Sequence, residues 1–388
     1  MADPRRAAGP QPANGTVNQD VTTKARQEVK EGNKFGAHRV IEPKGVLPQP
    51  AWKIDNTMEC ADNEILIEVD TLNVDAASFT QIEEAEGGDV KKMARHSLDI
   101  IAKRGKHHNP DTGSGGMLLG TVKEIGPKLK DRDLKVGDRI ATLVSLSLTP
   151  LKVDEVISIN RDTCQVKVKG QAILFETGIY SKIPADMDEA LALAILDVAG
   201  APAQAAKLSK PGQIVFIIGA GGKSGLLCAY EARKRVKPTG KVICLVHGDA
   251  GRKRLEKSGF ADVIIQGSAT DQLFVWEEVS KATDGEMADL TINCVDIPNT
   301  EMASILATKN DGLVYFFSMA TSFTSAALGA EGIGADTTMI IGNGYTKDHA
   351  VISLEVVRES PMLMEIFKNT YSTGSGNPEP VGIKASDA

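Results

Sequence analysis

Between residues 33 and 185 the chain alternates short apolar runs with turn residues. The segment NEILIEVDTL at 63–72 places apolar and polar side chains in turn, which is the period of a half-buried strand. The segments 115–126 and 135–146 repeat this style around glycine-containing turns, and one helical stretch at 87–105 interrupts it. Several short strands of this kind predict a partly open β-barrel or sandwich.

After residue 185 the pattern changes to helices that alternate with apolar strands. Residues 186–208 are rich in Ala and Leu and predict a helix. Six apolar runs follow, beginning at 213, 241, 261, 288, 312 and 337. Runs that are apolar on both faces are typical of parallel strands covered by helices on both sides. The predicted fold class is therefore α/β, with a doubly wound parallel sheet of the Rossmann type over 186–345 that follows the N-terminal β-barrel domain.

The two ends of the chain carry other signals. Residues 1–32 are rich in Pro, Gly, Asn, Thr and charge, and they predict a disordered tail because they bury little apolar area. Residues 346–388 contain one or two helices, which we expect to pack back on the protein. Their last stretch, TGSGNPEPVGIKASDA, predicts a flexible tail.

A glycine-rich turn follows the first strand of the Rossmann half. In GAGGKSG, Gly219, Gly222 and Gly225 are three residues apart, and Gly221 gives an overlapping frame. A tight strand-to-helix turn, close approach of a pyrophosphate and close helix–strand packing each need a residue without Cβ. The strand before and the helix after favour dinucleotide binding by this turn, including Lys223 and Ser224. The spacing of these glycines excludes a Walker P-loop, which needs four residues between its two glycines.

The end of the second strand bears on the choice of cofactor. An acidic residue there would hold the ribose of NAD, but the chain reads LVHGDAGRKR, with His247 at the expected position and Asp249 two residues later. Arg252 follows and would suit a 2′-phosphate, although it equally fits a solvated helix position. NAD is expected, with NADP as the alternative.

Composition narrows the class of protein. The net charge of −7 gives no general attraction to nucleic acid or to an anionic membrane surface, and no apolar run is long enough to span a bilayer. The five cysteines are scattered without a C-x-x-C pair, which favours reduced structural thiols. We therefore expect a cytoplasmic protein that binds neither nucleic acid nor membrane.

The order of these segments resembles the medium-chain dehydrogenase/reductase superfamily. NEILIEVDTLNVDAASF and GTVKEIGPKLKDRDLKVGDRIATLV look like its GroES-like elements, and the glycine spacing resembles the quinone-reductase branch. Longer segments, such as GAHRVIEPKGVLPQPAWKIDN and VYFFSMATSFTSAALGAEG, are similar to the L-erythro-3,5-diaminohexanoate dehydrogenase family. That resemblance implies oxidative deamination of 3,5-diaminohexanoate at C3 with NAD(P), in anaerobic lysine fermentation. It also implies a homodimer.

The metal ligands of zinc-dependent relatives have no counterparts here. The first ligand region reads DAASFTQ, with Ser78 where a thiolate is expected, and the second reads SGGMLLG without His or Glu. No metal is therefore expected, and proton transfer would fall to side chains. Ser78 and Thr80 lie in this ligand-bearing loop, and we expect them to face the substrate.

The implied substrate has one carboxylate and two amines, so its site needs a base and groups of both charges. Asp197 lies in the apolar segment AILDVAG, where burial tends to tune a carboxylate, and is the candidate base. Glu176, at the return of the barrel, is an alternative base or an ammonium ligand. Each of these carboxylates equally fits a structural role.

A carboxylate normally needs a cation. The candidate anchors are Arg39, Lys44, Lys106, His107 and His108. At the carboxyl ends of later Rossmann strands we expect cofactor contacts, mainly from backbone, by Asn293, Cys294, Ser318 and Met319. Two other functions fit the same features: an NADPH-dependent quinone or enone reductase, and a dinucleotide-binding protein without catalysis.

Overall fold

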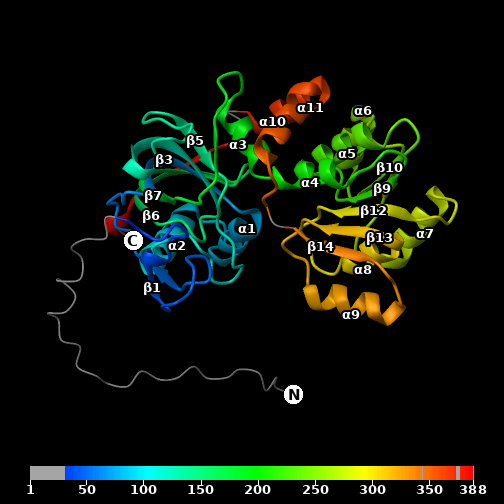
Figure 1. Cartoon of the computed structure of the whole chain (residues 1–388), viewed down its shortest axis with the longest axis horizontal. Helices are drawn as coiled ribbons and strands as arrows, with labels where there is room; N and C mark the ends of the chain where they lie inside the picture. The colour runs from blue at the N-terminus through cyan, green and yellow to red at the C-terminus, as the bar shows by residue number, and fades with distance from the viewer. Residues whose placement is uncertain (1–30, 343, 373–375, 388) are drawn as a thin grey trace, which may run out of the picture.

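The computed structural model describes residues 31–342, 344–372 and 376–387, which form two bodies side by side (Figure 1). A seven-stranded antiparallel sheet in the order β15-β6-β7-β3-β4-β5-β8 forms the N-terminal body, and a two-stranded pair β1-β2 lies beside it. A six-stranded parallel sheet in the order β11-β10-β9-β12-β13-β14 forms the other. The predicted combination of a β-rich domain with a Rossmann sheet is confirmed.

The N-terminal body is built around the long strand β3. Its elements are β1 (Val40–Glu42), β2 (Lys53–Ile54), β3 (Glu64–Val74), α1 (Ala76–Ala85), α2 (Val90–Arg104), β4 (Gly116–Ile125), β5 (Arg139–Thr142), β6 (Leu151–Asn160), β7 (Gln165–Phe175) and β8 (Tyr180–Lys182). Alternate residues of β3 face opposite sides of the sheet. Ile65 and Ile67 join the main core of this body, whereas Leu66 joins a smaller cluster with Ile173 and Phe175. The strand is thus buried on both faces rather than half-buried.

The Rossmann body is doubly wound. Its elements are α4 (Gly200–Leu208), β9 (Ile214–Ile218), α5 (Lys223–Val236), β10 (Lys241–Val246), α6 (Asp249–Ser258), β11 (Val263–Gln266), α7 (Gln272–Ala282), β12 (Ala288–Asn293), α8 (Glu301–Leu306), β13 (Thr308–Phe316), α9 (Phe323–Ile333) and β14 (Thr338–Ile341). The chain runs outward from β9 to β11 and then returns to β12, so the strand order reverses between β9 and β12. Ligands of such sheets bind at the carboxyl ends of the strands beside this switch point.

One apolar cluster joins the two bodies. Met117 and Leu119 of β4 belong to the same buried cluster as Leu191 and Ile195 of α3 (Glu189–Leu196), and this cluster continues into β9. Helices α10 (His349–Glu359) and α11 (Pro361–Tyr371) lie above this junction (Figure 1). Helix α10 contacts α3, α4 and α5, and helix α11 contacts α3 and α6. The C-terminal helices therefore pack back across the junction.

The last part of the chain does not match the expected flexible tail. Strand β15 (Glu379–Lys384) pairs antiparallel with β6 at the edge of the N-terminal sheet. Val381 and Ile383 are buried, because the short alternation PVGIK places both on one face. The predicted disordered tail, residues 1–32, lies outside the described residues except for its last two. Of these, Gly32 exchanges two hydrogen bonds with the side chain of Asn63.

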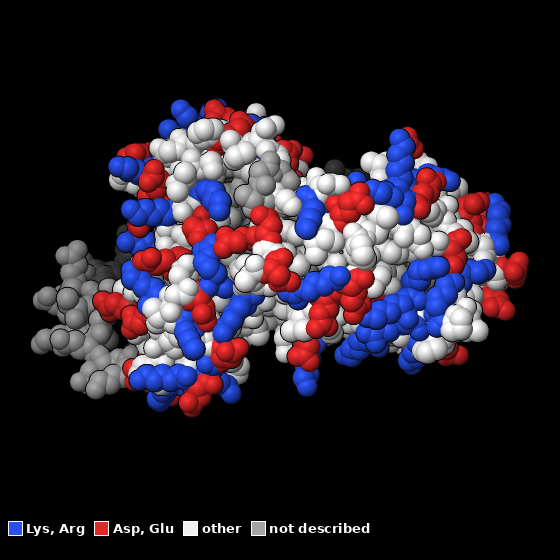
Figure 2. Space-filling model, turned by 90° about the horizontal axis from the view of Figure 1, so that it is seen from above, with Lys and Arg blue, Asp and Glu red and all other residues white. Residues whose placement is uncertain are grey.

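Charges of both signs cover the N-terminal half of the face in Figure 2, whereas Lys and Arg gather over the Rossmann half. Cations of the Rossmann body also have carboxylate partners; Lys234 pairs with Glu359, and Lys257 with Glu365. No single helix among the described residues has the length and apolarity to cross a membrane, although α3 and α4 would pass as one span bent by 51°.

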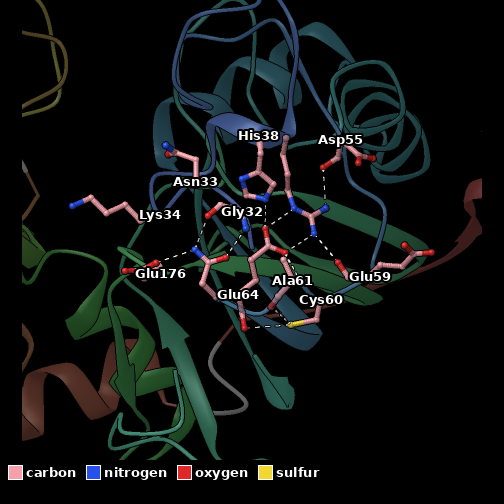
Figure 3. A network of polar contacts seen from close by, with 12 residues as sticks. Gly32, Asn33, Lys34, His38, Asp55, Glu59, Cys60, Ala61, Glu64 and Glu176 are labelled. Atoms are coloured by element: carbon pink, nitrogen blue, oxygen red, sulfur yellow. Dashed lines mark hydrogen bonds and ion pairs between the residues drawn. The ribbon is translucent and has the colours of Figure 1, made fainter. Parts of the chain in front are cut away.

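A buried ion pair fixes the start of β3. Arg39 donates from Nε and Nη2 to both carboxylate oxygens of Glu64, at 2.7 and 2.6 Å, and its other contacts are backbone carbonyls (Figure 3). His38 and the amide of Ala61 also contact this carboxylate. Burial alone would raise the pKa of Glu64, but the hydrogen bonds and charge of Arg39 outweigh it and lower this pKa to about 2.

Arg39→Met should destabilise the protein, because it leaves the Glu64 carboxylate buried without its partner. We expect the free energy of unfolding to fall by about 3–5 kcal/mol at neutral pH, measured by urea denaturation. Replacing both residues by apolar ones should cost less than Arg39→Met alone. The pair stabilises the fold fully above the usual carboxyl pKa of 4.5 and loses this effect as the pH falls toward about 2. A variant with unchanged stability would contradict this role.

Candidate active site

The glycine-rich turn leaves β9 as the sequence predicted. Gly219 has a φ of +78°, which a residue with a side chain rarely adopts. At Gly225 an added Cβ would lie 2.4 Å from the carbonyl oxygen of Gly219, so only glycine lets α5 approach the strand this closely. Gly221 instead makes room for α6, since its Cβ would lie 2.5 Å from Cα of Gly251.

The turn fits the phosphates of a dinucleotide. Gly222 is the N-cap of α5 and provides no side-chain cap, so the first amides of the helix stay available. An added Cβ at Gly222 would have the carbonyl oxygen of Gly219, at 3.5 Å, as its sole neighbour within 4 Å, so this side of the turn is open. The backbone amide of Gly222 already donates to the carbonyl of Gly219 at 3.1 Å, so the amides of Lys223 and Ser224 are the groups that would hold a pyrophosphate there.

The end of β10 carries both acidic and basic groups. His247 is exposed, and Asp249 begins α6. Gln266 of β11 donates to Asp249 Oδ1 at 2.8 Å and accepts from Arg252 at 3.4 Å. An acidic group of the kind that would hold a ribose and a cation of the kind that would meet a 2′-phosphate therefore lie together. The sequence reading missed Arg254, which donates to the carbonyl of Gly221.

The later strand ends fall into two groups. Asn293 is fully buried, and its amide donates to Thr300 and Ser304, so its side chain serves the fold. Cys294 has its sulfur 3.9 Å from that of Cys228. Ser318 donates to Asp296 at 3.5 Å, and Met319 is 73% exposed. Met319 thus stays reachable, whereas the side chains of Asn293 and Ser318 are buried.

Asp197 lies where the two bodies meet. Its Oδ1 accepts a hydrogen bond from Asn73 Nδ2 of β3 at 3.0 Å, and its Oδ2 pairs with Lys223 Nζ of α5 at 2.6 Å. Asp197 directly follows α3, so three separate elements converge on one carboxylate. Burial alone would lower the pKa of Lys223, but the negative charge and the hydrogen bond of Asp197 outweigh it and raise the pKa of Lys223.

A cleft of about 110 Å³ surrounds this carboxylate. The cleft is lined mainly by residues of β3, the β6–β7 turn, α3, α5 and α11. The lining residues are Asn73, Val74, Ala76, Asp162, Thr163, Cys164, Gln165, Ala190, Ala194, Asp197, Lys223 and Tyr371. The cleft lies next to the carboxyl end of β9 and the glycine turn, which is where a Rossmann fold places its reacting ligand. This cleft is the candidate active site.

A second carboxylate, Asp75, lies beside the cleft and was not singled out from the sequence. It caps α1 through a hydrogen bond from the backbone of Ala77, and it also accepts from Ser114 Oγ. Burial, and then the negative charges of Asp197 and Asp296, raise the pKa of Asp75. Because N-caps are often Asp, the sequence alone gave no reason to separate it from other caps.

The segment expected to be a loop that carries catalytic hydroxyls is helix α1, and of its two candidate residues one is buried and one exposed. Ser78 is fully buried and shares hydrogen bonds with Thr112, at 2.7 Å, and Ser114, at 2.6 Å. Through Ser114 this hydroxyl cluster reaches Asp75. Thr80 is exposed on α1. In the described part of the chain, no three His, Cys, Asp or Glu side chains are grouped so that they could hold a metal ion.

Arg39 and Glu176 lie away from the cleft. The donors of Arg39 are taken up by Glu64 and backbone carbonyls, and Glu176 accepts from Asn63 at the edge of the same network (Figure 3). Asn73 follows Glu64 by nine residues along β3, which corresponds to about 30 Å at the rise of an extended strand. The prediction that Arg39 anchors the substrate carboxylate is therefore wrong, because Arg39 stabilises the fold. Neither Arg39 nor Glu176 reaches Asp197.

The other expected anchors are also engaged elsewhere. Lys44 donates to the carbonyl of Val40. Lys106 is fully buried and donates to the carbonyls of Pro48 and Gln49, and burial lowers its pKa to about 7. His107 is buried, with no hydrogen-bond partner for its ring among the described residues. His108 contacts Arg104 at 3.1 Å. The contacts of Lys106 join residues far apart in the chain, so the sequence did not reveal them, whereas those of Lys44 and His108 each join residues four positions apart.

Two glycine substitutions should separate folding from dinucleotide binding. Gly225→Ala places a Cβ against the backbone of Gly219, and we expect a lower melting temperature together with weaker binding. Gly222→Ala has room, so its melting temperature should stay unchanged while its Kd for the reduced dinucleotide rises. Calorimetry and cofactor fluorescence check the pair. An unchanged Kd for Gly222→Ala would contradict the placement of the phosphates.

Comparison with known proteins gives a consistent result. Residues 38–184 match the family model of the L-erythro-3,5-diaminohexanoate dehydrogenase N-terminal domain. The L-erythro-3,5-diaminohexanoate dehydrogenase of Acetoanaerobium sticklandii is 59% identical over 342 residues, covering 88% of this chain and 99% of that protein. The enzyme of the same name from Fusobacterium nucleatum is 59% identical over 344 residues, covering 88% of this chain and 100% of that protein.

Solved structures extend the comparison to the fold alone. CurK enoyl reductase superposes with a TM-score of 0.50 at 17% identity, covering 82% of this chain and 81% of that chain. The apo form of JamJ enoyl reductase gives 0.50 at 13% identity, covering 82% and 84%. The sequence matches extend over almost the whole length of both relatives and include both bodies described above. The chain belongs to the L-erythro-3,5-diaminohexanoate dehydrogenase family.

Proposed function

We propose that this protein is an amino acid dehydrogenase that oxidatively deaminates L-erythro-3,5-diaminohexanoate at C3. The products are 5-amino-3-oxohexanoate, ammonia and a reduced nicotinamide dinucleotide. The observation that carries the proposal is the 59% identity to two dehydrogenases of that name over nearly their whole length. We propose NAD as the preferred cofactor, with NADP as the alternative, since Asp249 and Arg252 lie together at the end of β10.

The residues of the cleft suit this chemistry. The ammonium at C3 must lose a proton before its lone pair can support loss of hydride from C3, and Asp197 is our candidate for the base. When bound, the oxidised nicotinamide ring accepts the hydride. Water then adds to the resulting iminium and ammonia leaves, which requires further proton transfers. The negative charges of Asp197 and Asp296 both act on Asp75, and we propose Asp75 and Asp296 as partners of the second ammonium of the substrate.

An assay with the purified protein tests the activity. We expect L-erythro-3,5-diaminohexanoate to reduce NAD⁺ or NADP⁺ at alkaline pH, with one ammonia released for each dinucleotide reduced. In the same assay, Asp197→Asn should lower turnover far more than cofactor affinity. Absorbance of the reduced cofactor and an ammonia determination provide the readouts.

The same assay separates the other candidate functions. Oxidation of NADPH by quinones or enones without reaction of the diamine would favour a quinone or enone reductase. Dinucleotide binding without turnover of either substrate would leave a non-catalytic binding protein. The two solved structures named above are enoyl reductases, but at 17% and 13% identity they support only the fold.

We also propose that the protein forms a homodimer through β14. This strand is the edge of the parallel sheet and pairs with β13 on one side. Exposed apolar side chains gather beside it; Phe323 is 73% exposed, Leu328 62%, Ile333 49% and Ile341 53%. An unpaired strand edge with an apolar border favours self-association about a two-fold axis.

Charged substitutions test this surface. Leu328→Lys combined with Ile341→Lys should convert a dimer to a monomer in analytical ultracentrifugation. Ile157→Lys is the matched control, because Ile157 is 48% exposed but lies on β6 of the other body. A double variant that sediments like the wild type, or a wild-type protein that sediments as a monomer, would refute the proposed interface.

A further inference from the structure

The ion pair between Lys223 and Asp197 lines the candidate active site. Lys223 Nζ lies 2.6 Å from Asp197 Oδ2, and the two side chains are 24% and 25% exposed. Both line the cleft, so a ligand can reach both charges. A cation and an anion held this close form a receptor for a ligand whose own charges are equally close together.

Lys223 is also the sole Lys or Arg among the described residues that line the cleft. Of the cations expected from the sequence, Arg39 is engaged with Glu64, and Lys44 and Lys106 with backbone carbonyls, all outside this cleft. His107 and His108 do not line the cleft either. A carboxylate that enters the cleft therefore has one ammonium to meet. Lys223 keeps capacity for it, since an ammonium has three donors and Asp197 occupies one.

The bond to Asn73 gives the anion of the pair a fixed position. Asn73 Nδ2 donates to Asp197 Oδ1 and is itself buried on β3, while Lys223 is held at the first position of α5. The carboxylate thus stays oriented when its partner changes. Lys223 also lies 5.7 Å from the ring centre of Tyr371, whose face provides a second favourable contact for the ammonium.

We propose that Lys223 binds the substrate carboxylate while Asp197 binds the C3 ammonium, so that one ion pair of the free protein becomes two in the complex. The proposal rests on the proposed function and defines how that substrate is placed. No charge is left unpaired at the end of the exchange, which avoids the large cost of an isolated buried charge. Lys223 is thereby assigned to the substrate as well as to the glycine turn.

This arrangement accounts for the choice between two similar amines. The C3 amine is separated from the carboxylate by one methylene carbon, whereas the C5 amine is two carbons further away. The short distance between Lys223 and Asp197 fits the nearer pair of charges. The ion pair would therefore place C3, rather than C5, at the reacting position.

Substrates with and without a carboxylate test the assignment. The compounds are L-erythro-3,5-diaminohexanoate and 2,4-diaminopentane, which keeps both amines but lacks the carboxylate. Lys223→Met should lower kcat/KM for the diamino acid on the order of 100-fold. For the diamine it should not reduce kcat/KM, or weaken inhibition if the diamine is not turned over, by more than about threefold, because the amine still meets Asp197. Lys223→Arg should restore part of the loss, because it keeps the charge.

Controls separate this role from others. Lys234→Met removes an exposed cation from the same helix and should leave both compounds unaffected. The dinucleotide Kd and the melting temperature of Lys223→Met show whether the turn and the fold persist. Equal losses for both compounds, or a loss explained by cofactor affinity or unfolding, would overturn the assignment. If the wild type does not oxidise the diamino acid, the proposed function itself fails and the assignment fails with it.

Discussion

The carboxylate of Asp197 is the point on which the two halves of this protein converge. One of its oxygens accepts a hydrogen bond from Asn73 of the N-terminal sheet, and the other pairs with Lys223 at the start of α5. A hydrogen bond to a charged group contributes more than a neutral one and also fixes direction. Together with the apolar cluster that joins the two bodies, this side chain thus fixes the placement of the glycine turn relative to the β-rich domain, within the site where the chemistry would occur.

Strand β3 connects the buried Arg39–Glu64 pair to the residues beside Asp197. The Arg39–Glu64 pair holds its start, and Asn73 and Asp75 follow at its other end. The strand lies in the middle of its sheet, with β7 on one side and β4 on the other. A residue at its end therefore has little freedom to move, which suits a group that orients the carboxylate we propose as the base.

Local patterns predicted most of the fold. The parallel strands were recognisable because each is apolar on both faces, and the glycine turn because its residues need positions without Cβ. The last strand, β15, was missed because its five-residue alternation lies among Gly, Asn and Pro, which predict a loop. Its partner β6 lies more than 200 residues away, and no local signal indicates such a pairing.

The site was less predictable than the fold, for a related reason. A sequence shows that Arg39, Lys106 and His107 carry polar or charged side chains, but it does not show which of them a distant contact already satisfies. Asp197 could be singled out because a carboxylate in an apolar segment is unusual. Lys223 was recognised for its place in the turn, but its contact with Asp197 joins residues 26 positions apart and required the folded chain.

The return of β15 to the N-terminal sheet changes how the two bodies are connected. The chain leaves that sheet after β8, forms the whole Rossmann body, and comes back to pair with β6. The Rossmann body is thus inserted into the N-terminal body and joined to it by two chain connections, rather than attached at its end by one. Free rotation of one half about the other is therefore blocked, and any opening of the cleft must be a hinge motion about an axis that passes near both connections.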